Sequence, residues 1–438
     1  MQTNLLSGES TVFRNNLSRI LNTPISAKVI IYAMLIYVVV MRYATTALSF
    51  PGYASFLLDV LNVLALVFAL KRRRALHGIG FKAVIFIFAT YCCALLITDI
   101  LNGVQLPLIA WAMRNTFRLF VFFYACVALL DKSDIDRLFK MMFCMQIINV
   151  IVTLYQFGAL GLRQDYLGGI FGIAEGCNAY TNVFMSMLLV YYGFKWLDGD
   201  KGCTAKLLFI VVSSLIIAAL AELKVFFLEF ACLVVVLSLM RIGKVRSILG
   251  ILISVVALIM GLQVFKAVFP QAYSDMMDFD EMVAYSTEGM AGYELSRFGS
   301  FEQIDSLIFN KDPVRSAFGV GFGGAEESNI SLFTSSFSQV WGYLNYRWFT
   351  HQMTFIETGY VGFCLFVMVF VVYAIWLMKK VKRVPESKVL IQFSFIMTLF
   401  TIFNFWYNCA TRIECCYFIA FSLAVGAIAV RASFSKSR

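Results

Sequence analysis

The sequence predicts an all-α protein that crosses a membrane many times. Of its 438 residues, 61% are hydrophobic and only 14% are charged, and the mean hydropathy is +0.80. A soluble domain carries roughly 25% charged residues, so this composition excludes an ordinary soluble enzyme. The apolar residues gather in runs of about 20, which is the length that a helix needs to cross the hydrocarbon core.

Twelve apolar runs follow one another along the chain. The two that are least clearly separated are 205–221 and 224–240, which only Glu222 and Lys224 divide. The predicted division is residues 1–266 with nine transmembrane helices, a large loop over 267–350, and residues 351–438 with three more helices and a tail. We expect about twelve transmembrane helices, over 29–48, 53–70, 81–101, 107–130, 139–160, 178–197, 205–221, 224–240, 247–266, 352–378, 389–408 and 415–431.

The positions of Lys and Arg predict the orientation, because cytoplasmic loops of membrane proteins carry an excess of both. With the N-terminus inside, alternate segments place 25 of the 36 Lys and Arg residues on one side, including the clusters at 71–74 and 379–383. We therefore expect both termini in the cytoplasm and the loop 267–350 on the opposite face. The net charge of +10 then follows from topology, and no nucleic-acid partner is expected.

The loop 267–350 is the longest polar segment of the chain. It contains an acidic run at 275–281, a Gly-rich stretch at 318–324 and an aromatic end at 333–349. A disordered segment would carry few aromatic residues, so we expect this loop to fold over the membrane face and cover a cavity. His351 follows it directly, where the chain re-enters the membrane. The second histidine, His77, falls in a predicted cytoplasmic loop.

Three features of this region resemble the O-antigen polymerase and ligase superfamily, the Wzy and WaaL type of lipid-linked glycan enzymes. The segment 351–362 begins with His-Gln and continues with Glu-x-Gly-x-x-Gly, which looks like the family's element at the end of its large periplasmic loop. Arg297 is followed about twenty residues later by Gly-x-Gly-Phe-Gly at 319–323, similar to another family arrangement. Lys224 stands where these proteins often carry a Ser-Arg or similar basic pair. The resemblance covers 220–375 by motif and the whole chain by topology.

The resemblance implies a GT-C-like fold in the bacterial inner membrane, with the active site facing the periplasm. It implies a glycosyltransferase that is most like a Wzy-type polysaccharide polymerase, whose donor and acceptor are both undecaprenyl-diphosphate-linked glycans. Membrane lipids and a chain-length regulator protein are the further expected partners. No cofactor or metal is expected, because fixed cations aimed at a leaving diphosphate lower the barrier without one.

The implied transfer needs a proton acceptor and a cationic cradle. His351 is the predicted general base, because an unperturbed imidazole titrates near the working pH. Arg297 is the first choice for the diphosphate, since a planar guanidinium donates two hydrogen bonds to phosphate oxygens. We expect further substrate contacts from Lys224, Arg163, Arg412, Arg114, Arg118 and Arg315.

Several alternatives stay open at this point. Arg114 and Arg118 lie one helical turn apart, and they either line a cavity or pair with Asp99 or Asp131 near the span ends. His351 is either a base or a residue that only caps its helix. A ligase, whose acceptor is a lipid A core, needs the same clamp and base. A lipid-linked glycan flippase would also have about twelve spans, but transporters commonly show internal repeats, and we find none here.

Overall fold

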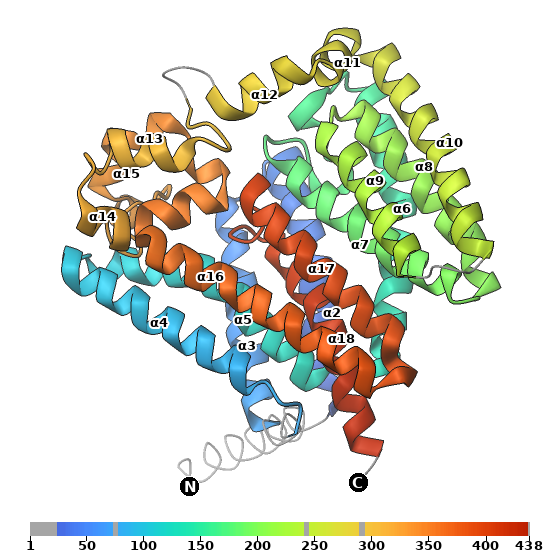
Figure 1. The fold of residues 1–438 in the computed structure, drawn as a ribbon, viewed down its shortest axis with the longest axis horizontal. Helices are drawn as coiled ribbons and strands as arrows, with labels where there is room; N and C mark the ends of the chain where they lie inside the picture. Colours follow the sequence, from blue (N-terminus) through green and yellow to red (C-terminus); the bar gives the residue numbers. More distant parts are fainter. Residues whose placement is uncertain (1–23, 73–77, 241–244, 289–293, 437–438) are drawn as a thin grey trace, which may run out of the picture.

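The computed structural model describes residues 24–72, 78–240, 245–288 and 294–436. Every regular element within these ranges is an α-helix or a short 3-10 helix (Figure 1). Arg73, Arg74 and His77, which the sequence places in a cytoplasmic loop, lie outside the described residues, as does the basic N-terminal segment 1–23.

Within this part of the chain, ten helices are long and apolar enough to cross a membrane, which confirms the prediction of an α-helical polytopic membrane protein. Each of the twelve predicted runs is helical. Two helices fall outside the ten: α9 is only 16 residues long, and the Asn and Tyr residues of α7 lower its hydropathy. The long helices are α2 (Pro24–Ala47), α3 (Phe56–Lys71), α4 (Lys82–Asn102), α5 (Leu106–Leu129), α6 (Lys132–Gly158), α7 (Cys177–Leu197), α8 (Thr204–Leu220), α9 (Lys224–Leu239), α10 (Val245–Val268), α16 (Thr350–Arg383), α17 (Lys388–Tyr407) and α18 (Cys416–Lys436).

Local sequence sets where several of these helices begin and end. The Asp131 side chain accepts a hydrogen bond from the backbone N–H of Asp134 in the first turn of α6, and the Asp134 side chain accepts one from the Asp131 N–H. This capping box starts α6 ahead of the apolar run predicted from 139. Glu222 adopts a left-handed conformation with φ of 53°, which separates α8 from α9. Gly359 interrupts α16, with φ of 59° and ψ of −165°.

The helices differ in how much of their surface other parts of the protein cover. α7 is buried over nearly its whole length, and 78% of the apolar window of α18 is buried, where it packs on α5 and α17. α10 is the opposite case, because only 11% of its window is buried and it packs on α8 and α9 (Figure 1). An apolar helix whose surface is mostly not covered by other helices is suited to contact with lipid.

Between α10 and α16 the chain forms short helices, and we call residues 269–349 the inserted segment. Its α-helices are α11 (Pro270–Met277), α12 (Phe279–Glu288), α13 (Ser300–Leu307), α14 (Pro313–Phe318) and α15 (Ser336–Trp341). In Figure 1, α12 runs from α11 towards α13, and α13, α14 and α15 gather at the start of α16. A buried cluster that includes Ile304, Phe309 and Tyr346 packs against Phe355 and Ile356 of α16. The inserted segment is therefore anchored on α16.

The Gly-rich stretch of the inserted segment packs directly on the interruption of α16. The Gly323 N–H donates a 2.9 Å hydrogen bond to Glu357 Oε1. A Cβ on Gly319 would lie 2.5 Å from the carbonyl carbon of Glu357, and a Cβ on Gly359 would lie 2.4 Å from that of Ala317. Glycine is needed at these two positions, because the two backbones approach too closely for any side chain.

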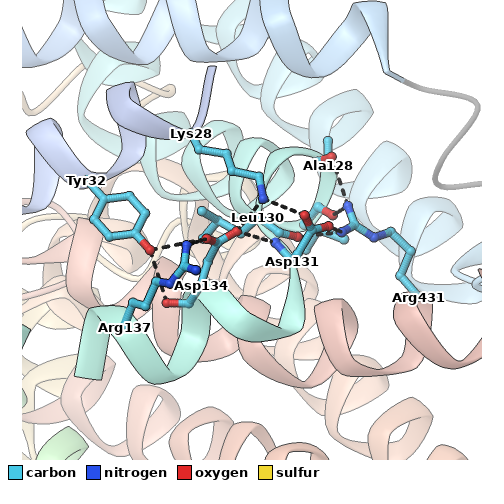
Figure 2. A network of polar contacts seen from close by, with 9 residues as sticks. Lys28, Tyr32, Ala128, Leu130, Asp131, Asp134, Arg137 and Arg431 are labelled. Atoms are coloured by element: carbon cyan, nitrogen blue, oxygen red, sulfur yellow. Dashed lines mark hydrogen bonds and ion pairs between the residues drawn. The ribbon is translucent and has the colours of Figure 1, made fainter. Parts of the chain in front are cut away.

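A polar network joins helix ends at the opposite side of the bundle (Figure 2). Lys28 of α2 lies 2.7 Å from Asp134 of α6, and Tyr32 donates a 3.3 Å hydrogen bond to the same carboxylate. Arg431 of α18 contacts Asp131 at 3.1 Å and donates to backbone carbonyls at the end of α5. The start of α2, the start of α6 and the end of α18 thus meet at one end, which we call the Asp131 end.

Candidate functional site

His351 lies in the first turn of α16, at the end of the bundle opposite Asp131, and its side chain is fully buried. Its Nε2 lies 3.1 Å from the carbonyl oxygen of Arg297 and 3.2 Å from Oγ of Ser300. The imidazole stacks on Trp406 of α17, with 4.4 Å between ring centroids and 6° between planes. The ring therefore bonds across to the inserted segment and does not cap its own helix.

These contacts define the tautomer of His351. A backbone carbonyl can only accept a hydrogen bond, so Nε2 carries the proton and donates it to Arg297. In a neutral imidazole, Nδ1 is then the acceptor. Nδ1 is buried and has no partner with regular hydrogen-bond geometry in the described ranges, and the ring lies within hydrogen-bonding range of the Trp406 backbone. The side chain thus presents an unprotonated nitrogen whose orientation is fixed by stacking.

Arg297 is the second predicted catalytic residue, and it lies beside His351 although 54 positions separate the two. Its guanidinium carbon lies 4.8 Å from the centre of the Tyr407 ring and 5.2 Å from that of Phe349. Trp406, which stacks on His351, directly precedes Tyr407. His351 and Arg297 are therefore joined in two ways. The Arg297 carbonyl bonds the imidazole, and the adjacent residues Trp406 and Tyr407 contact one side chain each.

A buried ionic network, which we call the Arg412 network, lies next to this pair. Arg412 contacts the carboxylates of Glu326 and Glu357, whose side chains are 4% and 1% exposed. Burial alone would lower the pKa of the Arg412 guanidinium, but the two carboxylates outweigh it and raise the pKa. Thr411 donates a 3.0 Å hydrogen bond to Thr350, the residue before His351. The network is therefore coupled to the first turn of α16.

The network continues through Arg118 and Glu414. Arg118 lies 3.2 Å from the Glu414 carboxylate and also donates to the Arg412 carbonyl. Tyr180 of α7 donates a 2.7 Å hydrogen bond to Glu414. Burial tends to raise the pKa of Glu414, but the Arg118 charge and the Tyr180 hydroxyl outweigh it and hold the pKa at about 2. Glu414 is therefore ionised and paired.

Arg114 joins the same region through a different partner. Its Nε lies 2.8 Å from Asp59 of α3, and it donates a 3.0 Å bond to Asn115, which in turn bonds Glu326. Of the two readings left open by the sequence, pairing is what the contacts favour for Arg114 and Arg118. The partners are Asp59 and Glu414, and not Asp99 or Asp131, the two that the sequence offers for the pairing alternative.

The other three predicted substrate-binding residues lie apart from these contacts and have local partners. Arg163 donates 2.8 Å bonds to the carbonyls of Phe157 and Leu162. Lys224 lies 3.3 Å from Glu222 at the start of α9, and Arg315 lies 3.9 Å from Asp312 in α14. No hydrogen bond or ion pair joins any of the three to His351, Arg297 or the Arg412 network within the described part of the chain.

Sequence reasoning missed several residues that shape the site. Trp406 carried a weak signal, as an aromatic residue at the end of a predicted span. Glu414 lies two positions from Arg412 in the same short turn, a spacing that favours a shared location. Glu326 follows the Gly-rich stretch, and nothing in its local sequence distinguishes it from the neighbouring Glu327. Ser300 also carried no signal.

In the parts of the chain that the structure covers, no three His, Cys, Asp or Glu side chains come together in a way that could hold a metal ion. No family model matches the chain, and no curated protein matches it either.

Proposed function

We propose that the chain is a polysaccharide polymerase of the bacterial inner membrane, with twelve spans, a GT-C-like fold and its active site facing the periplasm. It joins oligosaccharide repeats that are carried on undecaprenyl diphosphate into O-antigen or a capsular or exopolysaccharide. The observation that carries this proposal is the pairing of His351, whose Nδ1 has no side-chain partner, with Arg297, whose backbone carbonyl accepts from Nε2 and whose guanidinium lies over the ring of Tyr407, next to Trp406. A base next to a phosphate-binding cation is what this transfer requires.

The reaction moves one proton and one glycosidic bond. A hydroxyl oxygen of the acceptor glycan attacks the anomeric carbon of the donor, and its proton passes to Nδ1 of His351. The bond between that carbon and the diphosphate oxygen breaks, and the electron pair leaves with the undecaprenyl diphosphate. Stacking on Trp406 keeps the imidazole oriented for proton transfer, while Nε2 stays bound to the Arg297 carbonyl.

The positive charge of Arg297 stabilises the negative charge that develops on the leaving diphosphate. Removing one such contact typically costs about 3–4 kcal/mol in the transition state. The Arg412 network has a different role. Its arginines already face carboxylates, so they position the first turn of α16 through Thr411 and Thr350.

Substrate reaches Nδ1 by displacing aromatic side chains. His351 is fully buried, while Phe298 is 64% exposed and stacks on Trp406 with 6.4 Å between ring centroids. The entry of a sugar ring past Phe298 and Trp406 would exchange these contacts for stacking against the glycan. Chain elongation and water exclusion then take place under the inserted segment, which is anchored on α16.

Purified protein in detergent tests the proposal, because no compartments exist there and transport cannot be mistaken for synthesis. With lipid-linked repeats as both donor and acceptor, we expect longer chains to accumulate. Transfer only to a lipid A core acceptor would assign a ligase. Failure to elongate a verified substrate, combined with movement of the same lipid across vesicle membranes, would replace the polymerase with a flippase.

Deletion of the gene in a host that makes such a glycan provides a second test. We expect single repeats to remain on the lipid carrier or the core, because polymerisation is lost. Full-length polymer that persists on the carrier without reaching the core would contradict the polymerase and favour the ligase.

A further inference from the structure

A pocket at the Asp131 end lies between the first turns of α6, the end of α7 and the start of α8. Its volume is about 270 Å³, and its lining includes Lys140, Lys195, Lys206, Asp136 and Asp200. The pocket shares no residue with the His351 site or the Arg412 network, which lie at the opposite end of the bundle. It is therefore a separate feature of the molecule.

Both carboxylates of the pocket are already engaged in its wall. Asp136 lies 2.5 Å from the Lys195 ammonium and accepts a 2.5 Å hydrogen bond from Tyr191. Asp200 accepts a 3.0 Å bond from the Gly202 N–H. These bonds fix the two acidic side chains and leave the pocket with more basic than acidic groups.

Lys140 and Lys206 supply that excess. Neither makes an ion pair within hydrogen-bond distance in the described ranges, although Lys140 is electrostatically coupled to Asp136. The Lys206 ammonium lies 5.7 Å from the centre of the Phe143 ring and 5.9 Å from that of Tyr192. The two rings lie close to the Lys206 side chain, which lines the pocket, and its ammonium can bind an anion there.

Exposed apolar side chains lie further along α6 and α8 than the lysines of the pocket. Leu208 and Val212 of α8 are 53% and 44% exposed, and Ile147 and Ile148 of α6 are 40% and 53% exposed. These side chains follow Lys206 and Lys140 along their helices towards the bilayer interior. Ile147 lies on the same face of α6 as Lys140, because they are seven residues apart. A lipid with its phosphate in the pocket can therefore place an acyl chain against this face of α6.

We propose that this pocket binds a phosphate group, and that the phosphate belongs to the headgroup of an anionic lipid in the adjacent leaflet. Lysine binds phosphate as a point charge, and basic pockets between transmembrane helices bind anionic headgroups. The volume suits a headgroup, being just below the range of pockets that hold drug-sized ligands. The inference does not depend on the proposed polymerase activity.

Thermal unfolding of the intact protein in a non-ionic detergent tests the inference. Short-chain phosphatidylglycerol should raise the Tm of the wild type more than short-chain phosphatidylcholine does. The K140Q/K206Q variant should need roughly 25-fold more phosphatidylglycerol for half the effect, at roughly fivefold for each lysine. Lys206→Arg keeps the charge and should keep the response.

The matched control is K379Q/K382Q, which removes two exposed lysines near the end of α16 and should respond as the wild type does. Glycerol 3-phosphate distinguishes the source of the phosphate. If it stabilises the wild type as well as the lipid does, the pocket serves soluble phosphates. An unchanged response in K140Q/K206Q, or equal effects of the two lipids on the wild type, would overturn the assignment.

Discussion

Charged side chains gather at both ends of the helix bundle, but water reaches the two groups to different extents. In the Arg412 network, Arg118, Glu326 and Glu357 are at most 4% exposed. At the Asp131 end, the Asp131 side chain is 61% exposed and that of Arg137 is 71% exposed (Figure 2). Solvent screens Asp131 and Arg137 more than it screens the Arg412 network, and Asp134, only 3% exposed, keeps Lys28 as a second partner. The same kind of contact therefore has different consequences at the two ends.

Ionic contacts therefore have two roles in the molecule. At the Asp131 end they join helix ends where solvent can replace a lost partner. At the His351 end each charge depends on its neighbour, because removing one partner leaves the other buried without compensation. The following changes test that comparison, beginning with the largest expected effect.

Arg118→Met should have the largest effect on stability. It removes the cation that faces Glu414, and the free energy of unfolding should fall by about 3–5 kcal/mol, as for other broken buried pairs. Thermal unfolding in detergent measures the loss. A fall in the free energy of unfolding of less than about 1 kcal/mol would mean that water enters the Arg412 network. The two ends would then not differ in solvent screening.

Acidification should weaken the same contact. The pKa of Glu414 is about 2 in the folded protein, below the ordinary value of 4.5. Its ionised form therefore contributes stability above pH 4.5, and that contribution is lost as the pH falls from 4.5 towards 2. The difference in Tm between the wild type and Glu414→Gln should be constant between pH 7 and 5 and shrink below 4.5. A difference independent of pH over that window would contradict the pairing.

Gly359→Ala should have an intermediate effect. The alanine Cβ would meet the Ala317 carbonyl carbon at 2.4 Å, in a backbone conformation that side chains rarely adopt. We expect a loss of at least about 2 kcal/mol, from strain and from displacement of the Gly-rich stretch that binds Glu357. Gly158→Ala is the matched control, since nothing lies within 4 Å of its added Cβ and its φ is negative. Equal unfolding temperatures for the two variants would refute the close packing.

Arg137→Met should have the smallest effect. Its guanidinium lies 3.8 Å from Asp134 and is 71% exposed, so we expect a change of at most about 1 kcal/mol. Raising the salt concentration should reduce even that difference. A loss as large as that of Arg118→Met would show that exposure does not separate the two ends.

Much of the fold could be predicted because a helix must reach a fixed length to cross a bilayer. Every predicted apolar run is helical, and α8 and α9 separate at Glu222. The position of each helix in the bundle could not be predicted, because residues that face lipid and residues that face protein are both apolar. The exposed α10 is more apolar than the buried α18, but both are apolar enough to cross a membrane, so composition alone does not show which of them other helices cover.

The site was accessible to sequence reasoning only in part. The motifs singled out His351 and Arg297, but the bond between them runs to a backbone carbonyl, which no side-chain pattern records. The partners of Arg114 and Arg118 come from α3 and from the turn before α18, and helix spacing cannot identify contacts between distant helices. Position near the span ends makes Asp99 and Asp131 possible partners in the sequence, but it does not show which helices are neighbours.

The most direct test of the central claim is the rate of glycan elongation by His351→Ala, with Arg347→Ala as the control from the inserted segment. Both variants should be compared with the wild type at equal amounts of folded protein in detergent. We expect His351→Ala to lose between about 10² and 10⁴ in rate, because it lacks the nitrogen that accepts the acceptor proton. Arg347→Ala should retain activity, since its 2.9 Å contact with Glu327 is partly exposed. Elongation at the wild-type rate by a correctly folded His351→Ala protein would contradict the proposed role of the imidazole.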